Sequence, residues 1–411
     1  MTRNLSNRIY GAWGACSIFP LFAGVLMGVI VLAYSHAQPH APDSFQSLAQ
    51  RAAAARAKGD LPSAIQLYRK ALALKPDWQE GLWSYGSVLY DSNRFGAATA
   101  ALHKLTVLNP KLGGAWAFLG LSEYETAQYG LALSDLQRAR FLGTGSDADL
   151  ADVVDYHVAV LLNAQSEPEA AQYLLSALFL RGRKSEDLQV AMGLALLRVP
   201  LLPTQIDPSK DALVHDAGTL AAVLAEKHYE DAVAGFRGLL EKYPGTSFVH
   251  YAWGAMLASQ GRDDAAETQF EEETKLNPDS ALAYTEWAYL ESKATRYAQA
   301  VSLSQKAVQL APNSFMAHYV LGSSLLATGK AEEAIPQLER ARDLAPESPE
   351  IHYSLSRAYV KAGRNTLAEQ ERAIFIQLKN KRQIHQGNGP QNAAPKGGAA
   401  EAPQPAAPTQ P

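Results

Sequence analysis

Three histidines are candidates for metal chemistry because of their spacing. His250 and His318 stand 68 residues apart, and His352 follows 34 residues later. Imidazole is a common metal ligand, so a ladder of imidazoles on successive structural units is one interpretation. In the other interpretation each histidine replaces an aromatic residue at a packing position. We favour packing, because no carboxylate recurs beside the three histidines in register.

Other chemical signals are weak. Asp147, Asp149, Asp152 and Asp155 stand near an expected helix start, where negative charge is favourable. A calcium site there needs more oxygen ligands than this spacing supplies. The sequence has no glycine-rich phosphate loop, no His-Glu-x-x-His or Gly-x-Ser-x-Gly motif, and no paired cysteines. We therefore expect no catalytic residue, no metal and no cofactor. The net charge of -4 argues against a nucleic-acid partner.

The histidines belong to a repeat with a period of 34 residues. Prolines recur at this interval at Pro76 and Pro110, and again at Pro244, Pro278, Pro312 and Pro346. A fixed period of this length predicts stacked structural units. Eight units begin at Phe45, Gln79, Gly113, Leu213, Ser247, Ala281, Phe315 and Pro349. Position 20 is then alanine in every unit, and position 8 is small in all but one, which lets two helices cross closely.

Each unit has the pattern of two helices. Trp253 and Leu257 are four residues apart in the first half of one unit, and Ala266 and Phe270 in the second, which is amphipathic helical spacing. Four units have glycine at position 15, where the first helix must end: Gly59, Gly261, Gly329 and Gly363. Proline at position 32 ends the second helix. Each unit is therefore predicted to be a helix, a tight turn, a helix and a proline turn.

This pattern resembles the tetratricopeptide repeat over about 45–146 and 213–382. The unit from Gly113 carries the family residues Trp116, Leu119, Gly120, Ala132, Leu136 and Ala139, and departs from the pattern at Thr144. The resemblance implies an all-α, right-handed superhelical solenoid of helix-turn-helix repeats. We expect three units in 45–146, degenerate helical repeats or a joint in 147–212, and five units in 213–382. Arg372 at position 24 suggests that the last unit caps the stack.

The two ends of the chain differ from the repeats. Arg3 and Arg8 precede a run without charged residues from Gly11 to Tyr34, so 1–37 is predicted to be a signal peptide or a transmembrane anchor. The bulk of the chain is then extracytoplasmic, in the periplasm if the source is bacterial, and either membrane-anchored or secreted after cleavage. Residues 383–411 are rich in proline, alanine and glycine, which predicts a disordered tail.

The resemblance also implies a concave groove lined by positions 2, 5, 9, 12 and 13 of the first helices. Aromatic residues at these positions are candidates for binding other proteins. They are Trp83, Tyr90, Tyr124, Tyr251, Tyr289, Tyr319 and Tyr353. The alternative is that they are partly buried between neighbouring repeats.

The predicted function is that of a non-enzymatic scaffold for protein–protein interactions. It would be tethered to the membrane or exported, and would bind partner segments in the groove. One alternative is an accessory subunit of an envelope assembly, secretion or polysaccharide-export complex. A second alternative is an enzyme with a site in 147–212.

Overall fold

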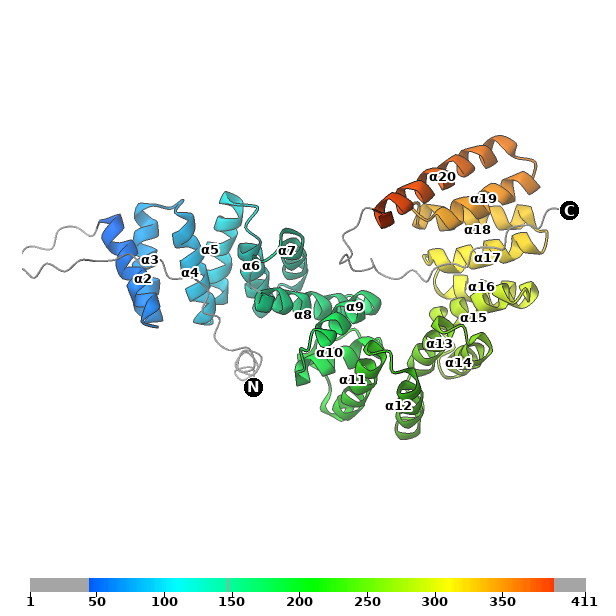
Figure 1. Ribbon diagram of the computed structural model, residues 1–411, viewed down its shortest axis with the longest axis horizontal. Helices are drawn as coiled ribbons and strands as arrows, with labels where there is room; N and C mark the ends of the chain where they lie inside the picture. Colours follow the sequence, from blue (N-terminus) through cyan, green and yellow to red (C-terminus); the bar gives the residue numbers. More distant parts are fainter. Residues whose placement is uncertain (1–43, 146–147, 388–411) are drawn as a thin grey trace, which may run out of the picture. The chain divides into compact units, whose positions relative to one another are not determined.

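The computed structural model describes residues 44–145 and 148–387, and all regular structure in this part of the chain is helical (Figure 1). The all-α helical-repeat fold predicted from the sequence is confirmed. The chain divides into two compact units. Unit 1 extends to Asp207 apart from Leu196–Arg198, which belong to unit 2, and the rest of unit 2 begins at Pro208. The division falls within 147–212, the range that breaks the sequence period.

Unit 1 begins with three helical hairpins. Consecutive helices pack as pairs, and each pair packs on the next. The pairs are α2 (Phe45–Ala57) with α3 (Leu61–Leu74), α4 (Gln79–Asp91) with α5 (Phe95–Leu108), and α6 (Gly113–Glu125) with α7 (Tyr129–Leu142). A fourth pair follows, α8 (Ala148–Ala164) with α9 (Pro168–Leu180). Then α10 (Glu186–Leu196) is followed by two short 3-10 turns, Pro203–Gln205 and Pro208–Lys210, in place of a second α-helix.

Unit 2 contains five hairpins in the described residues. They are α11 (Asp211–Ala225) with α12 (Tyr229–Lys242), α13 (Val249–Ser259) with α14 (Asp263–Leu276), α15 (Ala281–Lys293) with α16 (Tyr297–Leu310), α17 (Phe315–Ala327) with α18 (Ala331–Leu344), and α19 (Pro349–Lys361) with α20 (Asn365–Gly387). The last helix continues past 382, so 383–387 are helical and do not belong to the predicted disordered tail.

Small residues let the two helices of a hairpin approach closely. All eight alanines at position 20 are buried. At position 8, a Cβ atom on Gly322 would lie 2.6 Å from Leu338 Cγ, and one on Gly86 would lie 2.7 Å from Leu102. Real Cβ atoms do not approach neighbours this closely, so these crossings require glycine. Leu102 and Leu338, at position 24 of their units, fill the space that these glycines leave.

The turn inside each hairpin requires a left-handed residue at position 15. The four glycines have φ between 72° and 86° there, as predicted. The other four repeat units place Asn93, Ala127, Lys227 and Thr295 at the same position, with φ of 56° to 62°. Left-handed backbone costs non-glycine residues about 1 kcal/mol or more, so hairpin packing outweighs local preference at these four turns.

The predicted leader, 1–37, lies outside the described residues, as does the tail from 388 onwards. Among the helices that the structure describes, none combines the length and the apolar character needed to cross a membrane.

Candidate functional site: the first helices of the repeats

The three spaced histidines hold the ends of their hairpins together. His318 Nδ1 lies 2.8 Å from Gln337 Oε1, and its Nε2 lies 3.1 Å from the carbonyl oxygen of Pro312. His352 repeats this arrangement with Glu371, at 2.5 Å, and Pro346, at 2.8 Å. Trp116 stands at the same repeat position as these histidines, and its Nε1 donates to the carbonyl oxygen of Pro110.

The packing interpretation of these histidines was therefore incomplete. A polar partner does recur in register, 19 residues after each histidine: Gln269, Gln337 and Glu371. Each histidine ties the two helices of its hairpin together, and His318 and His352 also hold the preceding proline turn. No group of His, Cys, Asp and Glu suited to a metal ion occurs within 44–145 and 148–387.

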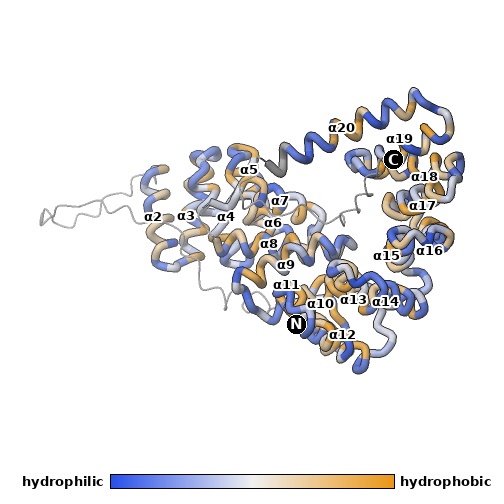
Figure 2. Tube along the Cα trace, turned by 45° about the vertical axis from the view of Figure 1, so that its right-hand side comes forward, coloured by the Kyte–Doolittle hydropathy of each residue, from blue (hydrophilic) through white to orange (hydrophobic). Residues whose placement is uncertain are grey.

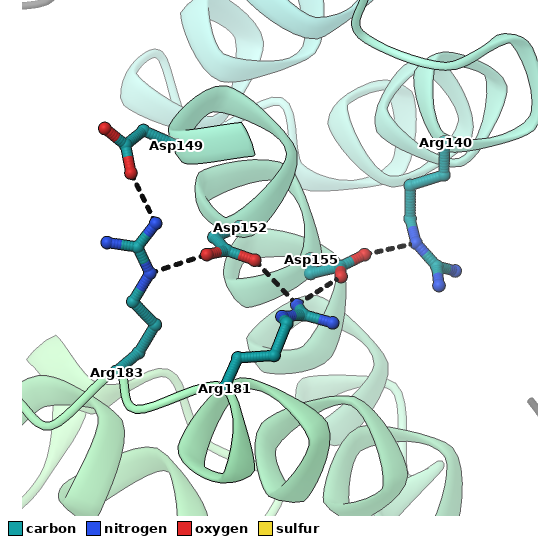
Figure 3. A network of polar contacts seen from close by, with 6 residues as sticks. All are labelled: Arg140, Asp149, Asp152, Asp155, Arg181 and Arg183. Atoms are coloured by element: carbon teal, nitrogen blue, oxygen red, sulfur yellow. Dashed lines mark hydrogen bonds and ion pairs between the residues drawn. The ribbon is translucent and has the colours of Figure 1, made fainter. Parts of the chain in front are cut away.

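The aspartates at the start of α8 pair with arginines (Figure 3). Arg140 of α7 binds Asp155 at 2.6 Å, and Arg181 after α9 binds Asp152 and Asp155 at 2.7 and 2.8 Å. A further arginine, Arg183, contacts Asp152 and Asp149. The alternating charges connect three successive helices of unit 1, so the aspartate oxygens are occupied by a structural ion-pair network. Asp147 lies outside the described residues.

A pair of carboxyls lies inside the α6–α7 hairpin, with Glu123 buried and Asp135 half-buried. Glu123 is 4% exposed, and burial, together with the charge of Asp135, raises its pKa to about 7. Burial also raises the pKa of Asp135, although the Glu123 carboxyl and His103 oppose this effect. Two carboxyls hydrogen-bond only when one holds a proton. Paired carboxyls of this kind can serve as general acids and bases, but Glu123 is closed to solvent in the hairpin core.

The aromatic candidates of unit 1 pack against one another or their neighbours. Trp83 is half-buried and meets Phe118 edge-to-face at 5.4 Å between ring centroids. Tyr90 is only 8% exposed, so it is a packing residue. Tyr124 is half-buried, 4.7 Å from the His157 ring, and burial raises its pKa. In unit 1 the interpretation of partial burial between repeats fits these positions best.

In unit 2 the structure brings Tyr289 and Tyr319 together. Both are half-buried and pack against one cluster, formed by Ala288, Leu303 and Val320. Burial raises the pKa of both hydroxyls. Charged neighbours also affect the two pKa values, and Arg357 lies beside Tyr319. Arg357 in turn lies 5.7 Å from the ring of Tyr353.

Tyr353 is more exposed, at 37%, and extends the same series of first helices from α15 to α19. We call Tyr289, Tyr319 and Tyr353 the tyrosine strip. Tyr251 is half-buried on α13, where it contacts Phe248, Phe270 and Arg198.

Glu286 lies beside this strip and was not identified from the sequence. It is half-buried on α15, three residues before Tyr289, and it forms no hydrogen bond or ion pair with the described residues. Burial raises its pKa. By contrast, the carboxylate of Glu273, which is fully buried, accepts hydrogen bonds from the backbone N–H of Phe248 at 2.8 Å and of Tyr251 at 3.3 Å. A carboxylate beside a tyrosine, without a partner in the part of the chain that the structure describes, is well placed to receive a cation.

Comparisons with known proteins covered solved structures, curated proteins and family models. Among solved structures, MamA from Desulfovibrio magneticus RS-1 is 22% identical, with 42% of this chain and 97% of that chain covered and a TM-score of 0.39. YrrB, described as a tetratricopeptide-repeat protein with an unusual peptide-binding site, is 17% identical, with 44% and 92% covered and a TM-score of 0.37. No curated protein matches. The family model of the tetratricopeptide repeat matches residues 285–349 and 319–375, which lie within the hairpins from α15 to α20.

Proposed function

We propose that this protein is a non-enzymatic scaffold that binds a segment of a partner protein along the tyrosine strip of unit 2. The observation that carries the proposal is Glu286, a half-buried carboxylate without a partner among the described residues. It lies close to Tyr289, which packs with Tyr319 against one cluster. Leaving a desolvated charge unpaired costs free energy, and a ligand cation would recover it. Tyrosine supplies rigid amphipathic contact area on either side.

The expected ligand is an extended or helical segment with at least one lysine or arginine. Its cation would lie against Glu286, and its neighbouring side chains would lie on the rings of Tyr289 and Tyr319. The site has a repeated aromatic surface, and none of the catalytic motifs sought in the sequence occurs in this part of unit 2. This argues for binding and against catalysis.

We further propose that the scaffold is tethered to a membrane, or exported, through residues 1–37. Support comes from the sequence alone, in the two arginines followed by a long run without charged residues. Alternatively, the same binding activity would serve an accessory subunit of an envelope assembly, secretion or polysaccharide-export complex.

Photo-crosslinking in the native host tests the binding proposal. A photoreactive amino acid replaces Tyr319 in the full chain, alone and combined with Glu286→Lys. The matched control is Glu230→Lys, an exposed charge reversal on α12. We expect one defined protein adduct, lost with Glu286→Lys and kept with Glu230→Lys, while circular dichroism stays unchanged. Absence of an adduct, or an adduct that Glu286→Lys leaves intact, contradicts the proposal.

A further inference from the structure

The last hairpin leaves an open surface where a further repeat would stack. A cavity of about 430 Å³ lies between α19 and α20. We call its principal lining the C-terminal face. It comprises Arg357, Val360 and Lys361 of α19, with Arg372, Phe375 and Ile376 of α20. Val360 is 58% exposed and Ile376 is 49% exposed. Figure 2 shows hydrophobic and hydrophilic residues alternating along α20, so this helix does not end the stack with a uniformly polar surface.

The preceding hairpin shows what this face is shaped to receive. Leu326 occupies the repeat position of Val360 and is 3% exposed, and Leu338 occupies that of Arg372 and is 0% exposed. Both belong to one buried cluster with Leu355 of α19. A helix with apolar residues on one side therefore covers this surface on the hairpin before. The same surface on the last hairpin is uncovered in the described residues.

The charge on the C-terminal face is positive and unbalanced. Arg357, Lys361 and Arg372 line the cavity without any acidic residue, and none of them pairs with a carboxylate within the described residues. Lys379 of α20 lies 5.8 Å from the ring of Phe375 and has no carboxylate partner in the described residues, whereas other cations nearby are paired. Arg382 binds Glu350 at 2.7 Å and Arg364 binds Glu332 at 2.6 Å. Arg357, Lys361, Arg372 and Lys379 therefore surround the exposed apolar residues without a carboxylate partner, although Lys361 donates to the carbonyl oxygen of Leu326 at 3.3 Å.

Parts of this chain do not match that face. Residues 1–42 contain no acidic residue, and the tail after Ile384 contains no large apolar residue. The first hairpin of a second copy would bring six basic residues and one acidic residue within 45–75, so the two ends would repel each other. The occupant is better sought in another protein.

We propose that the C-terminal face binds an acidic amphipathic helix of a partner protein, which continues the stack in place of a further repeat. Its apolar side would cover Val360, Phe375 and Ile376. Its carboxylates would pair with Arg357, Lys361 and Arg372 at the rim. This inference rests on the proposed scaffold function and adds a second surface, which adjoins the tyrosine strip at Tyr353. Its preference for an acidic ligand is opposite to that proposed for Glu286.

Selection from a peptide library tests the inference. The library displays helices of about 20 residues with apolar residues fixed at i, i+4, i+7 and i+11 and all other positions random. It is selected on the purified full chain and, in parallel, on an Arg357→Glu/Arg372→Glu variant. Both side chains are exposed, so the variant should keep the wild-type circular dichroism spectrum. Arg237→Glu, an exposed charge reversal on α12, is the matched control.

We expect the wild type to enrich peptides rich in glutamate and aspartate. Their binding should weaken at least about tenfold with the double variant and also with Val360→Ser, but not with Arg237→Glu. Enrichment of neutral or basic peptides, equal enrichment on the double variant, or no enrichment refutes the inference. Phosphatidylglycerol vesicles are tested alongside. Binding to them that requires Arg357 and Arg372, without acidic peptides, would assign the face to lipid and overturn the proposal.

The two proposals fail separately. Glu286→Lys should leave the acidic peptides bound, because Glu286 does not line the C-terminal face. Arg357 lies beside Tyr319, so the single variant Arg372→Glu is used for the reverse comparison, and it should leave the Tyr319 adduct intact. Loss of peptide binding in Glu286→Lys would point to one shared surface and would contradict the assignment of a second site.

Discussion

The carboxyl pair of the α6–α7 hairpin should make stability depend on pH near neutrality. Burial and Asp135 raise the pKa of Glu123 from 4.5 to about 7 in the folded protein. The folded state then holds a proton that the unfolded state has lost, between about pH 4.5 and pH 7. The stability that the Glu123–Asp135 pair contributes is fully present below about pH 4.5 and is lost as pH rises through about 7.

The magnitude follows from the size of the shift. One pKa unit corresponds to about 1.4 kcal/mol, so the loss on going from pH 4.5 to above pH 7 is as much as about 3 kcal/mol. Glu123→Gln removes the titration and lets an amide N–H₂ donate to Asp135. We expect little effect at pH 4.5 and a gain of up to about 3 kcal/mol at pH 8.

Urea unfolding, followed by circular dichroism at several pH values, measures the difference between variant and wild type. Glu80→Gln changes an exposed carboxyl of α4 and serves as the control, with no change expected. A Glu123→Gln protein that is less stable than the wild type at pH 8 would refute the reasoning. So would a difference between the two proteins that does not vary with pH.

Three further substitutions test the packing of the repeats, each by urea unfolding. Gly322→Ala should cost about 1–3 kcal/mol because its Cβ would meet Leu338 at 2.6 Å. The control Gly96→Ala, whose Cβ would have no atom within 4 Å, should be neutral or stabilising. Equal effects of the two substitutions would contradict this explanation. Thr295→Gly should stabilise by about 1 kcal/mol by relieving a φ of 62°, and destabilisation would show that the turn is not strained. Glu273→Ala should cost about 2–3 kcal/mol because partly buried N–H groups at the start of α13 lose their acceptor, and Glu273→Gln should recover part of that loss. Equal losses for both variants would argue against capping.

The sequence predicted what the repeat period determines. Alanine at position 20 and glycine at position 15 each satisfy one local requirement, close helix contact or left-handed backbone, so their pattern located the hairpins. Proline fits the first turn of a helix, and Pro168 stands at the start of α9.

Pairings between helices were harder to predict. His318 and Gln337 are 19 residues apart and meet only because two helices pack side by side. Aligning the units would have indicated the pair, because Gln269, Gln337 and Glu371 share position 23. Side-chain burial was also not predictable. Tyr90 at position 12 and Tyr353 at position 5 both occupy positions expected to line the groove, but they differ in what covers them.

Departures from the repeat are the most informative residues for function. Position 6 carries an acidic side chain only in the unit with Glu286, and packing between helices does not require a charge there. At the end of the stack, Arg372 replaces the apolar residue of position 24, as a polar cap would. Val360 and Ile376 nevertheless stay apolar although they are exposed. A finished cap has no need of these apolar residues, whereas a surface that receives another helix does.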